Sequence, residues 1–248
     1  MFHLNKIYVV GIGPGEYEKM TLQAINVLKE CDVIVGYPVY VDLVKDHFPD
    51  KEMLTTPMRK EIQRCELAFE KAREGKTTAM ICSGDAGVYG MSGLILEIGE
   101  KYPDTEVEIV SGVTAAIGGG AVLGAPLMHD FAVISLSDWL TPWDLIIKRL
   151  RAAAEADFCI VLYNPSSRAR QDYLEKAIDE IIKYRSPENV CGTVQNIGRE
   201  GEKMTLYTLE ELHHTPVDMF TTVFIGNSTT KVINGKMVTP RGYQKRME

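Results

Sequence analysis

The sequence predicts an α/β protein of two domains, and three observations carry this prediction. Strand-like apolar runs alternate with amphipathic helical segments over the first half of the chain. A second series of the same kind begins after residues 124–126. The last part of that series consists of short runs typical of antiparallel strands. We therefore expect a first domain over residues 1–126 with a largely parallel sheet, and a mixed α+β second domain over residues 127–248.

The first domain is expected to alternate four strands with three helices. The strands are expected at residues 7–10, 32–35, 77–82 and 107–110. The helices are expected at residues 21–30 and 59–74, and in the small-residue segment that ends near Leu123. Thr21 can cap the first of these helices through its hydroxyl group. Glu61 and Glu66 are interleaved with Arg59, Lys60 and Arg64 on the second helix, so we expect these cations on a solvated face.

The second domain is expected to contain five strands, two helices and a hairpin. The strands are expected at residues 131–136, 158–163, 190–195, 203–207 and 221–225. The helices are expected at residues 143–154 and 168–184. The pair Asn234-Gly235 is a strong hairpin signal, because both residues tolerate a positive φ.

Composition excludes several classes of partner. The chain of 248 residues has a net charge of −7, which argues against a nucleic-acid partner. It has no run near the roughly 20 apolar residues that a membrane span needs, and no signal peptide is visible, so we expect a cytoplasmic protein. The five cysteines form no CxxC pair, so we expect no metal site, and we expect buried thiols at Cys31, Cys82 and Cys159.

Three strands of the first domain end in glycine-rich turns. The turns are GIGPG at residues 11–15, SGDAGVYG at 83–90 and SGVT at 111–114. Because ligands bind at the carboxyl ends of strands in open α/β sheets, we expect a ligand site there. The turns do not fit a dinucleotide fold, because Glu16 replaces the third glycine and Pro14 lacks an N–H group. A P-loop is excluded, since the chain has no GxxxxGK[ST] motif.

Residues 10–24, 83–91, 111–127 and 161–167 together resemble the tetrapyrrole methylase family, the class III S-adenosylmethionine methyltransferases. The matching segments follow the family's order over nearly the whole chain. Residues 129–143 and 163–170 resemble the branch that methylates C17 of precorrin-3B or cobalt-factor III and contracts its ring during cobalamin biosynthesis. One departure is visible, since Ala86 stands where many members have proline.

The resemblance implies that S-adenosylmethionine binds in a folded form in a cleft between the two domains, with S-adenosylhomocysteine as the product. It also implies a tetrapyrrole substrate and a homodimer. The residues implied to contact S-adenosylmethionine are Pro14, Gly84, Asp85, Val88, Thr114, Ala115, Tyr163 and Asn164. The hydroxyl group of Thr114 either binds the ligand or caps the following helix.

Methyl transfer from a sulfonium needs alignment of donor and acceptor rather than a metal or a covalent enzyme intermediate. Ring contraction also needs proton movement, and the catalytic candidates are His129, Ser137 and Asp138. His129 is a general acid, a neighbour of the substrate's cobalt, or a residue hydrogen-bonded to backbone.

The many carboxylates of a tetrapyrrole call for guanidinium groups. Arg168, Arg170 and Arg199 follow strand ends and either bind the substrate or lie on solvated surfaces. Three other functions remain open: another methylase branch acting at a different corrin position, a diphthine-forming enzyme, and a non-catalytic S-adenosylmethionine or nucleotide sensor.

Overall fold

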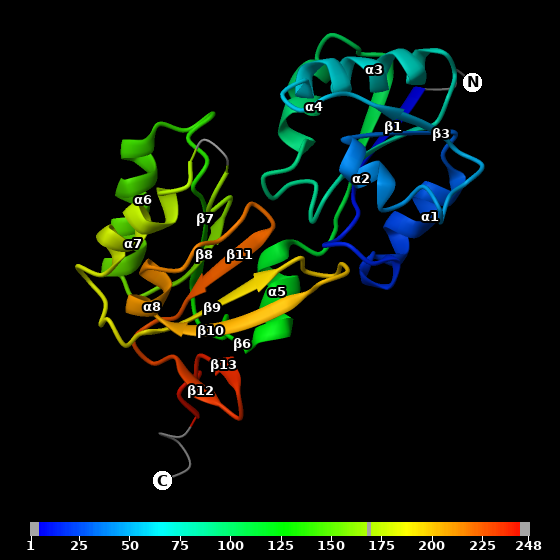
Figure 1. Cartoon of the computed structure of the whole chain (residues 1–248). Helices are drawn as coiled ribbons and strands as arrows, with labels where there is room; N and C mark the ends of the chain where they lie inside the picture. Colours follow the sequence, from blue (N-terminus) through cyan, green and yellow to red (C-terminus); the bar gives the residue numbers. More distant parts are fainter. Residues whose placement is uncertain (1–4, 168–169, 244–248) are drawn as a thin grey trace. The chain divides into compact units, whose positions relative to one another are not determined.

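The computed structural model describes residues 5–167 and 170–243 (Figure 1). It divides into two compact units, Met1–Ala115 and Ala116–Glu248, which we call the first and the second unit. Helix α5 (Ala115–Leu123) therefore belongs almost entirely to the second unit, whereas the sequence analysis counts it with the first domain. No helix in the described ranges is long and apolar enough to cross a membrane.

The first unit is built on a sheet of five strands in the order β3-β2-β4-β1-β5, and every pairing in it is parallel. The strands are β1 (Asn5–Gly11), β2 (Val33–Gly36), β3 (Glu52–Thr55), β4 (Thr78–Cys82) and β5 (Thr105–Val110). The largely parallel sheet predicted for this part of the chain is confirmed.

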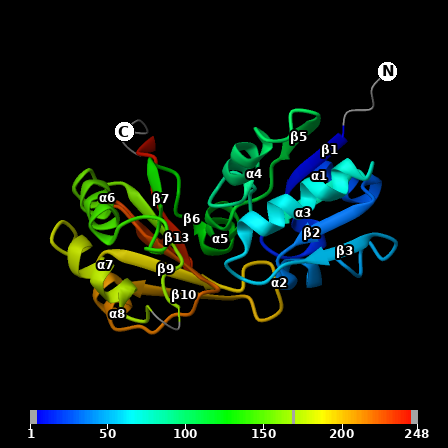
Figure 2. The same cartoon turned by 90° about the horizontal axis from the view of Figure 1, so that it is seen from above.

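Helices cover both faces of this sheet (Figures 1 and 2). One face packs against α1 (Leu22–Glu30) and α2 (Pro38–Asp42), and the short 3-10 helix η1 (Tyr17–Lys19) precedes α1. The other face packs against α3 (Glu61–Arg73) and α4 (Ser92–Gly99). The Thr21 hydroxyl caps α1, as predicted, by accepting from the backbone N–H of Ala24 at 3.1 Å.

The second unit contains a mixed sheet of five strands in the order β10-β9-β11-β8-β7. Its strands are β7 (Phe131–Ser135), β8 (Cys159–Tyr163), β9 (Val190–Gln195), β10 (Lys203–Thr208) and β11 (Thr221–Ile225). Strands β7 and β8 run parallel, and the pairings of β11 with β8, β11 with β9 and β10 with β9 are antiparallel. Strands β7, β8 and β9 consequently point the same way.

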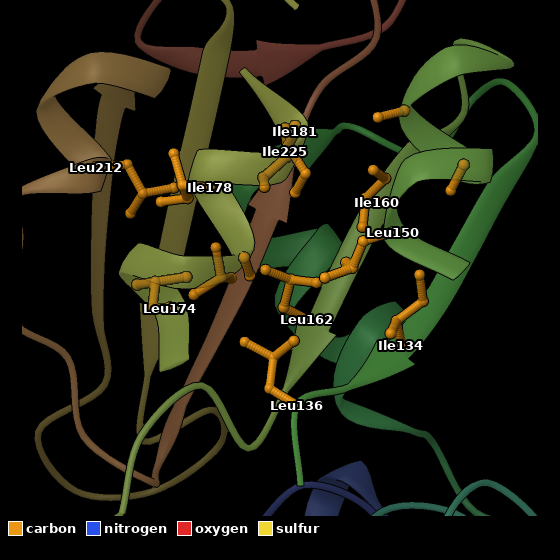
Figure 3. Packing of buried hydrophobic residues seen from close by; sticks show 14 of the residues in the cluster. Ile134, Leu136, Leu150, Ile160, Leu162, Leu174, Ile178, Ile181, Leu212 and Ile225 are labelled. Carbon is orange, nitrogen blue, oxygen red and sulfur yellow. The ribbon is translucent and has the colours of Figure 1, made fainter. Parts of the chain in front are cut away.

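The core of the second unit lies between this sheet and helices α6 (Trp143–Glu155), α7 (Tyr173–Ile181) and α8 (Leu209–His213), as Figure 3 shows. Helix α5 packs against the opposite face of the sheet. A Cβ atom on Gly119 of α5 would lie 2.8 Å from Cδ1 of Ile197 and 3.0 Å from the ring of Phe224. Glycine at this position therefore lets the helix approach the sheet closely.

A small third sheet of order β12-β13-β6 completes the second unit. It consists of β6 (Gly124–Ala125), β12 (Lys231–Ile233) and β13 (Lys236–Val238). The predicted hairpin at Asn234-Gly235 is confirmed, because φ is 50° at Asn234 and 72° at Gly235, the pair of positive values that a type I′ turn requires.

Three expectations differ from the structure. The helix predicted at residues 168–184 is shorter, since α7 begins at Tyr173, after a β-bridge between Ser167 and Arg170. Elements β3, α2, α4 and α8 were not predicted. The solvated face predicted for Arg64 is wrong, because its side chain is buried beneath the loop that joins β3 to α3, whereas Arg59 and Lys60 are exposed. The prediction of buried thiols at Cys31, Cys82 and Cys159 is confirmed.

Truncation of Leu150 tests the core of the second unit. The Leu150 side chain is fully buried between α6 and the sheet, so Leu150→Ala should lower the free energy of unfolding by about 2–5 kcal/mol in urea titrations. The matched control is Leu140→Ala, because Leu140 is 90% exposed and its truncation should change stability by about 0.5 kcal/mol at most. Equal losses in the two variants would contradict the packing described.

Candidate functional site

The loops that follow β1, β4 and β5 meet at the carboxyl edge of the first unit's sheet. Because β1 lies between β4 and β5, its loop touches both others. The backbone N–H of Gly13 donates to Gly84 O at 3.0 Å, and the N–H of Gly84 donates to Gly13 O at 2.8 Å. The glycine-rich turns after β1 and β4 are thus joined directly through their backbones.

The contact with the third loop leaves no room for side chains. A Cβ atom on Gly112 would lie 2.2 Å from Gly84 O, and one on Gly11 would lie 2.7 Å from Gly112 N. Only glycine fits at these positions without displacing the backbone. The close approach explains why these turns need glycines without a dinucleotide pattern.

Asp85 fastens the loop after β4 to the loop after β5. Its Oδ1 accepts from the backbone N–H of Gly87 at 2.8 Å, and its Oδ2 accepts from the backbone N–H of Gly112 at 2.8 Å. Hydrogen bonds to an ionised carboxylate are stronger than those between neutral groups. Each carboxylate oxygen can still accept a further hydrogen bond.

Gly84 faces the start of helix α5. Its φ is +69°, and a Cβ atom placed on it would lie 3.6 Å from Cα of Thr114 and 3.8 Å from the backbone nitrogen of Ala115. The structure therefore brings together Gly84, Asp85, Thr114 and Ala115. The same loops contain the other two residues that were predicted here, a buried Pro14 and a partly buried Val88.

In the second unit, the parallel strands β7, β8 and β9 end at one edge of the sheet. The Tyr163 hydroxyl, at the end of β8, accepts from the backbone N–H of Ala116 at 2.7 Å and so satisfies a free donor in the first turn of α5. Asn164 follows with φ 52°, and its Nδ2 donates to Ser135 Oγ at 2.9 Å. The first bond links the end of β8 to α5, and the second links the ends of β8 and β7.

A polar cluster follows at the same edge, and we call Ser137, Asp138, Arg170 and Tyr173 the arginine cluster. Nη1 of Arg170 donates to Ser137 Oγ and to Asp138 Oδ1, both at 2.9 Å. The Tyr173 hydroxyl donates to Asp138 Oδ2 at 2.7 Å. Two predicted catalytic residues and one predicted substrate-binding arginine are thus in direct contact.

The cluster keeps Asp138 ionised. The Tyr173 hydroxyl and then the Arg170 guanidinium hold the pKa of the Asp138 carboxyl below its usual range. In return, the hydrogen bond to Asp138 raises the pKa of the Tyr173 phenol. At neutral pH, Asp138 is therefore a hydrogen-bond acceptor and has no proton to donate.

The other predicted residues lie elsewhere. Arg199 lies in the turn after β9, where its backbone N–H donates to Asn196 O at 2.9 Å, so it shares the edge with the cluster. His129 precedes β7 and lies at the opposite edge, away from Ser137 and Asp138. A catalytic role for His129 stays a prediction. Arg168 lies outside the described residues.

Sequence reasoning missed two members of this site. Tyr173 lay inside a helix expected from residue 168, which hid the fact that it is the first residue of α7. Ser135 was counted only as strand, although its hydroxyl accepts from Asn164 and from the backbone N–H of Ser137 at 3.2 Å. The spacing of two residues between Ser135 and Ser137 was the available signal, because a serine hydroxyl can accept from the backbone N–H two residues further along the chain.

Tyr173→Phe should raise the pKa of Asp138 toward the ordinary aspartate value, since it removes the strongest hydrogen bond to the ionised form. The stability that ionised Asp138 contributes is present above the ordinary pKa and is lost as the pH falls through the lowered one, so the variant should show less of it. Carboxyl-labelled NMR titration measures the pKa, with Tyr184→Phe as the matched control. An unchanged pKa in Tyr173→Phe would assign the effect to Arg170 alone.

Comparison with known proteins agrees with this architecture. Residues 6–213 match the family model of the tetrapyrrole (corrin/porphyrin) methylases. A probable cobalt-factor III C(17)-methyltransferase of Salmonella typhimurium is 49% identical over 95% of this chain and 98% of its own length. The crystal structure of the methyltransferase CobJ superimposes with a TM-score of 0.88 at 32% identity, covering 95% of this chain and 100% of that chain.

A more distant structure shows the same fold. It is a uroporphyrin-III C-methyltransferase from Thermus thermophilus in complex with S-adenosylhomocysteine, with a TM-score of 0.73 at 24% identity over 89% of this chain and 97% of that chain. The family match and the full-length relative lead to one conclusion. This chain belongs to the tetrapyrrole methylase family.

Proposed function

We propose that this protein transfers the methyl group of S-adenosylmethionine to C17 of a corrin-type tetrapyrrole and contracts the ring, in cobalamin biosynthesis. The observation that carries the proposal is the 49% identity to the Salmonella protein over nearly the full length of both chains. Of the two candidate substrates we choose cobalt-factor III, because that relative's name contains it, and precorrin-3B is the metal-free alternative.

The loops of the first unit suit S-adenosylmethionine. Gly84 is buried next to the start of α5, and the atoms nearest to the place of its missing Cβ are backbone atoms of residues 113–115, so backbone rather than side chains lines this position. We assign the cofactor to Pro14, Gly84, Asp85, Val88, Thr114 and Ala115 of these loops, and to Tyr163 and Asn164 of the second unit. Asp85 contributes mainly by holding two of the loops in place, since both of its oxygens accept backbone N–H groups.

The reaction needs positioning more than strong acid–base groups. Bound S-adenosylmethionine supplies an electrophilic methyl group with a good leaving group attached. Rigid loops that align this methyl group with a nucleophilic carbon can lower the activation free energy by on the order of 7–11 kcal/mol. The arginine cluster offers an ionised Asp138 as acceptor and a Ser137 hydroxyl held by Arg170, and we assign these groups to the proton movements of ring contraction.

Two further features belong to the proposal by family resemblance alone. They are a homodimeric state, which light scattering of the purified protein would measure, and a cytoplasmic location.

Gly84→Ala should weaken S-adenosylhomocysteine binding by about tenfold, because an L side chain at φ +69° strains the loop by roughly 1–2 kcal/mol and its methyl group points toward Thr114 and Ala115. Titration calorimetry measures the affinity. The matched control is Gly93→Ala in α4, where a Cβ atom meets no other heavy atom within 4 Å. Wild-type affinity in Gly84→Ala would contradict the assignment of the cofactor to this loop.

The activity itself is tested by anaerobic incubation with S-adenosylmethionine and cobalt-factor III, followed by mass spectrometry and absorbance spectroscopy. We expect a gain of one methyl group together with the spectral change of a contracted ring. Methyl gain without contraction would support the methyltransferase activity and refute the assignment to the ring-contracting branch. Cofactor binding without methyl gain on this or any other tetrapyrrole intermediate would favour a non-catalytic sensor.

A further inference from the structure

The amino-terminal end of α3 buries a guanidinium group. The Arg64 side chain is 5% exposed, and its Nη2 donates to the backbone oxygens of Thr56 and Pro57, both at 3.3 Å. The guanidinium carbon lies 5.8 Å from the centre of the Tyr37 ring, which is within reach of a cation–π interaction. The cation is thus held in place by backbone oxygens and an aromatic face.

This buried cation has no counter-ion in the described part of the chain. No carboxylate there pairs with Arg64, its Nε–H finds no acceptor, and the hydroxyl of Thr56, which is 3% exposed, finds no partner. A buried charge and buried polar groups without partners are costly to the folded state. Such groups are rare in native proteins and point to a partner that the chain itself does not supply.

A second buried arginine shows how the chain treats an ordinary structural cation. Arg185 is 7% exposed, forms an ion pair with Asp157 and donates to Phe158 O at 2.8 Å, although its Nε–H, like that of Arg64, finds no acceptor. Arg64 has the same burial and lacks the carboxylate. The difference indicates that the carboxylate for Arg64 comes from a ligand.

The position of these groups supports a ligand. Tyr37 directly follows β2 and Thr56 directly follows β3, so both lie at the carboxyl edge of the parallel sheet. Strand β2 is the neighbour of β4, whose loop contains Gly84 and Asp85. Ligands of open parallel sheets bind along this edge.

We propose that Arg64 and Thr56, backed by the Tyr37 ring, form a binding subsite for a carboxylate of the tetrapyrrole substrate. The Nε–H of Arg64 and the Thr56 hydroxyl donate to the carboxylate oxygens, and the guanidinium neutralises its charge. This inference rests on the proposed function, because the tetrapyrrole supplies the acetate and propionate side chains. The proposed subsite belongs to the first unit and does not include the predicted substrate-binding residues Arg168, Arg170 and Arg199.

The test compares the full-length wild type with three variants. Absorbance titration under anaerobic conditions gives the affinity for cobalt-factor III, calorimetry gives the affinity for S-adenosylhomocysteine, and thermal unfolding gives Tm. Arg64→Gln removes the charge, and Thr56→Val removes the hydroxyl with little change of volume. Arg73→Gln is the matched control, because Arg73 lies on the same helix and is exposed.

We expect Arg64→Gln to weaken cobalt-factor III binding by about tenfold to a hundredfold, the range for a lost hydrogen bond to a charged group. Thr56→Val should weaken it several-fold with an unchanged or higher Tm, because valine removes an unsatisfied hydroxyl. Both variants should bind S-adenosylhomocysteine as the wild type does, and Arg73→Gln should match the wild type in every measurement.

Wild-type tetrapyrrole affinity in both Arg64→Gln and Thr56→Val would overturn the subsite. A second result would also overturn it: Arg64→Gln loses tetrapyrrole and cofactor binding equally, and Thr56→Val binds both normally. That pattern would indicate that Arg64 only stabilises the structure. Failure of the proposed function has a different signature. A wild type that binds cobalt-factor III without methylating it, with weakened variants, would support the subsite and refute the reaction, and a wild type that binds no tetrapyrrole would refute both.

Discussion

Direct backbone contact between the loops after β1, β4 and β5 is the constraint on which the candidate site of the first unit depends. A single added methyl group at Gly112 would lie 2.2 Å from a carbonyl oxygen of the neighbouring loop, so the three turns pack as bare backbone. This contact requires β1 to run between β4 and β5, which the parallel order of the sheet provides. The carboxylate of Asp85 then joins the second loop to the third without filling the space beside Gly84. The three turns therefore pack tightly through their backbones.

The arginines differ in what their charges can still do. Arg170 was predicted either to bind substrate carboxylates or to lie on a solvated surface, and in the structure it donates to Ser137 and Ser167 and forms an ion pair with Asp138. These bonds hold Ser137 and Asp138 in place. Arg64 was predicted to be solvated, yet it is buried and lacks a carboxylate in the described ranges. The position of an arginine near a strand end therefore does not show whether it can bind an anionic ligand. What matters is whether the arginine is buried and whether a carboxylate of the chain already pairs with it.

Local signals predicted much of the fold. Thr21 as a helix cap, Asn234-Gly235 as a hairpin turn and the glycine-rich strand ends each act within a few residues, and the structure confirms these elements. Helix α4 was not predicted because its central run Leu94-Ile95-Leu96 lacks the alternation of polar and apolar residues that marks an amphipathic helix. Strand β3 was not predicted because it is a short, half-exposed edge strand. The burial of Arg64 and the bond from Tyr173 to Asp138 depend on contacts between separate elements, which periodicity does not encode.

The ionisation of Asp138 limits how the second unit can assist ring contraction. Because Tyr173 and Arg170 both favour the charged form, Asp138 has no proton to give at neutral pH. The hydrogen bond that Tyr173 donates to Asp138 raises the pKa of the phenol, and burial and the nearby carboxylate charge add to this effect, so Tyr173 keeps its proton more firmly than a free phenol does. Its lowered pKa also makes Asp138 a weak proton acceptor, so the cluster is suited to accept a hydrogen bond and to keep Ser137 in a fixed orientation.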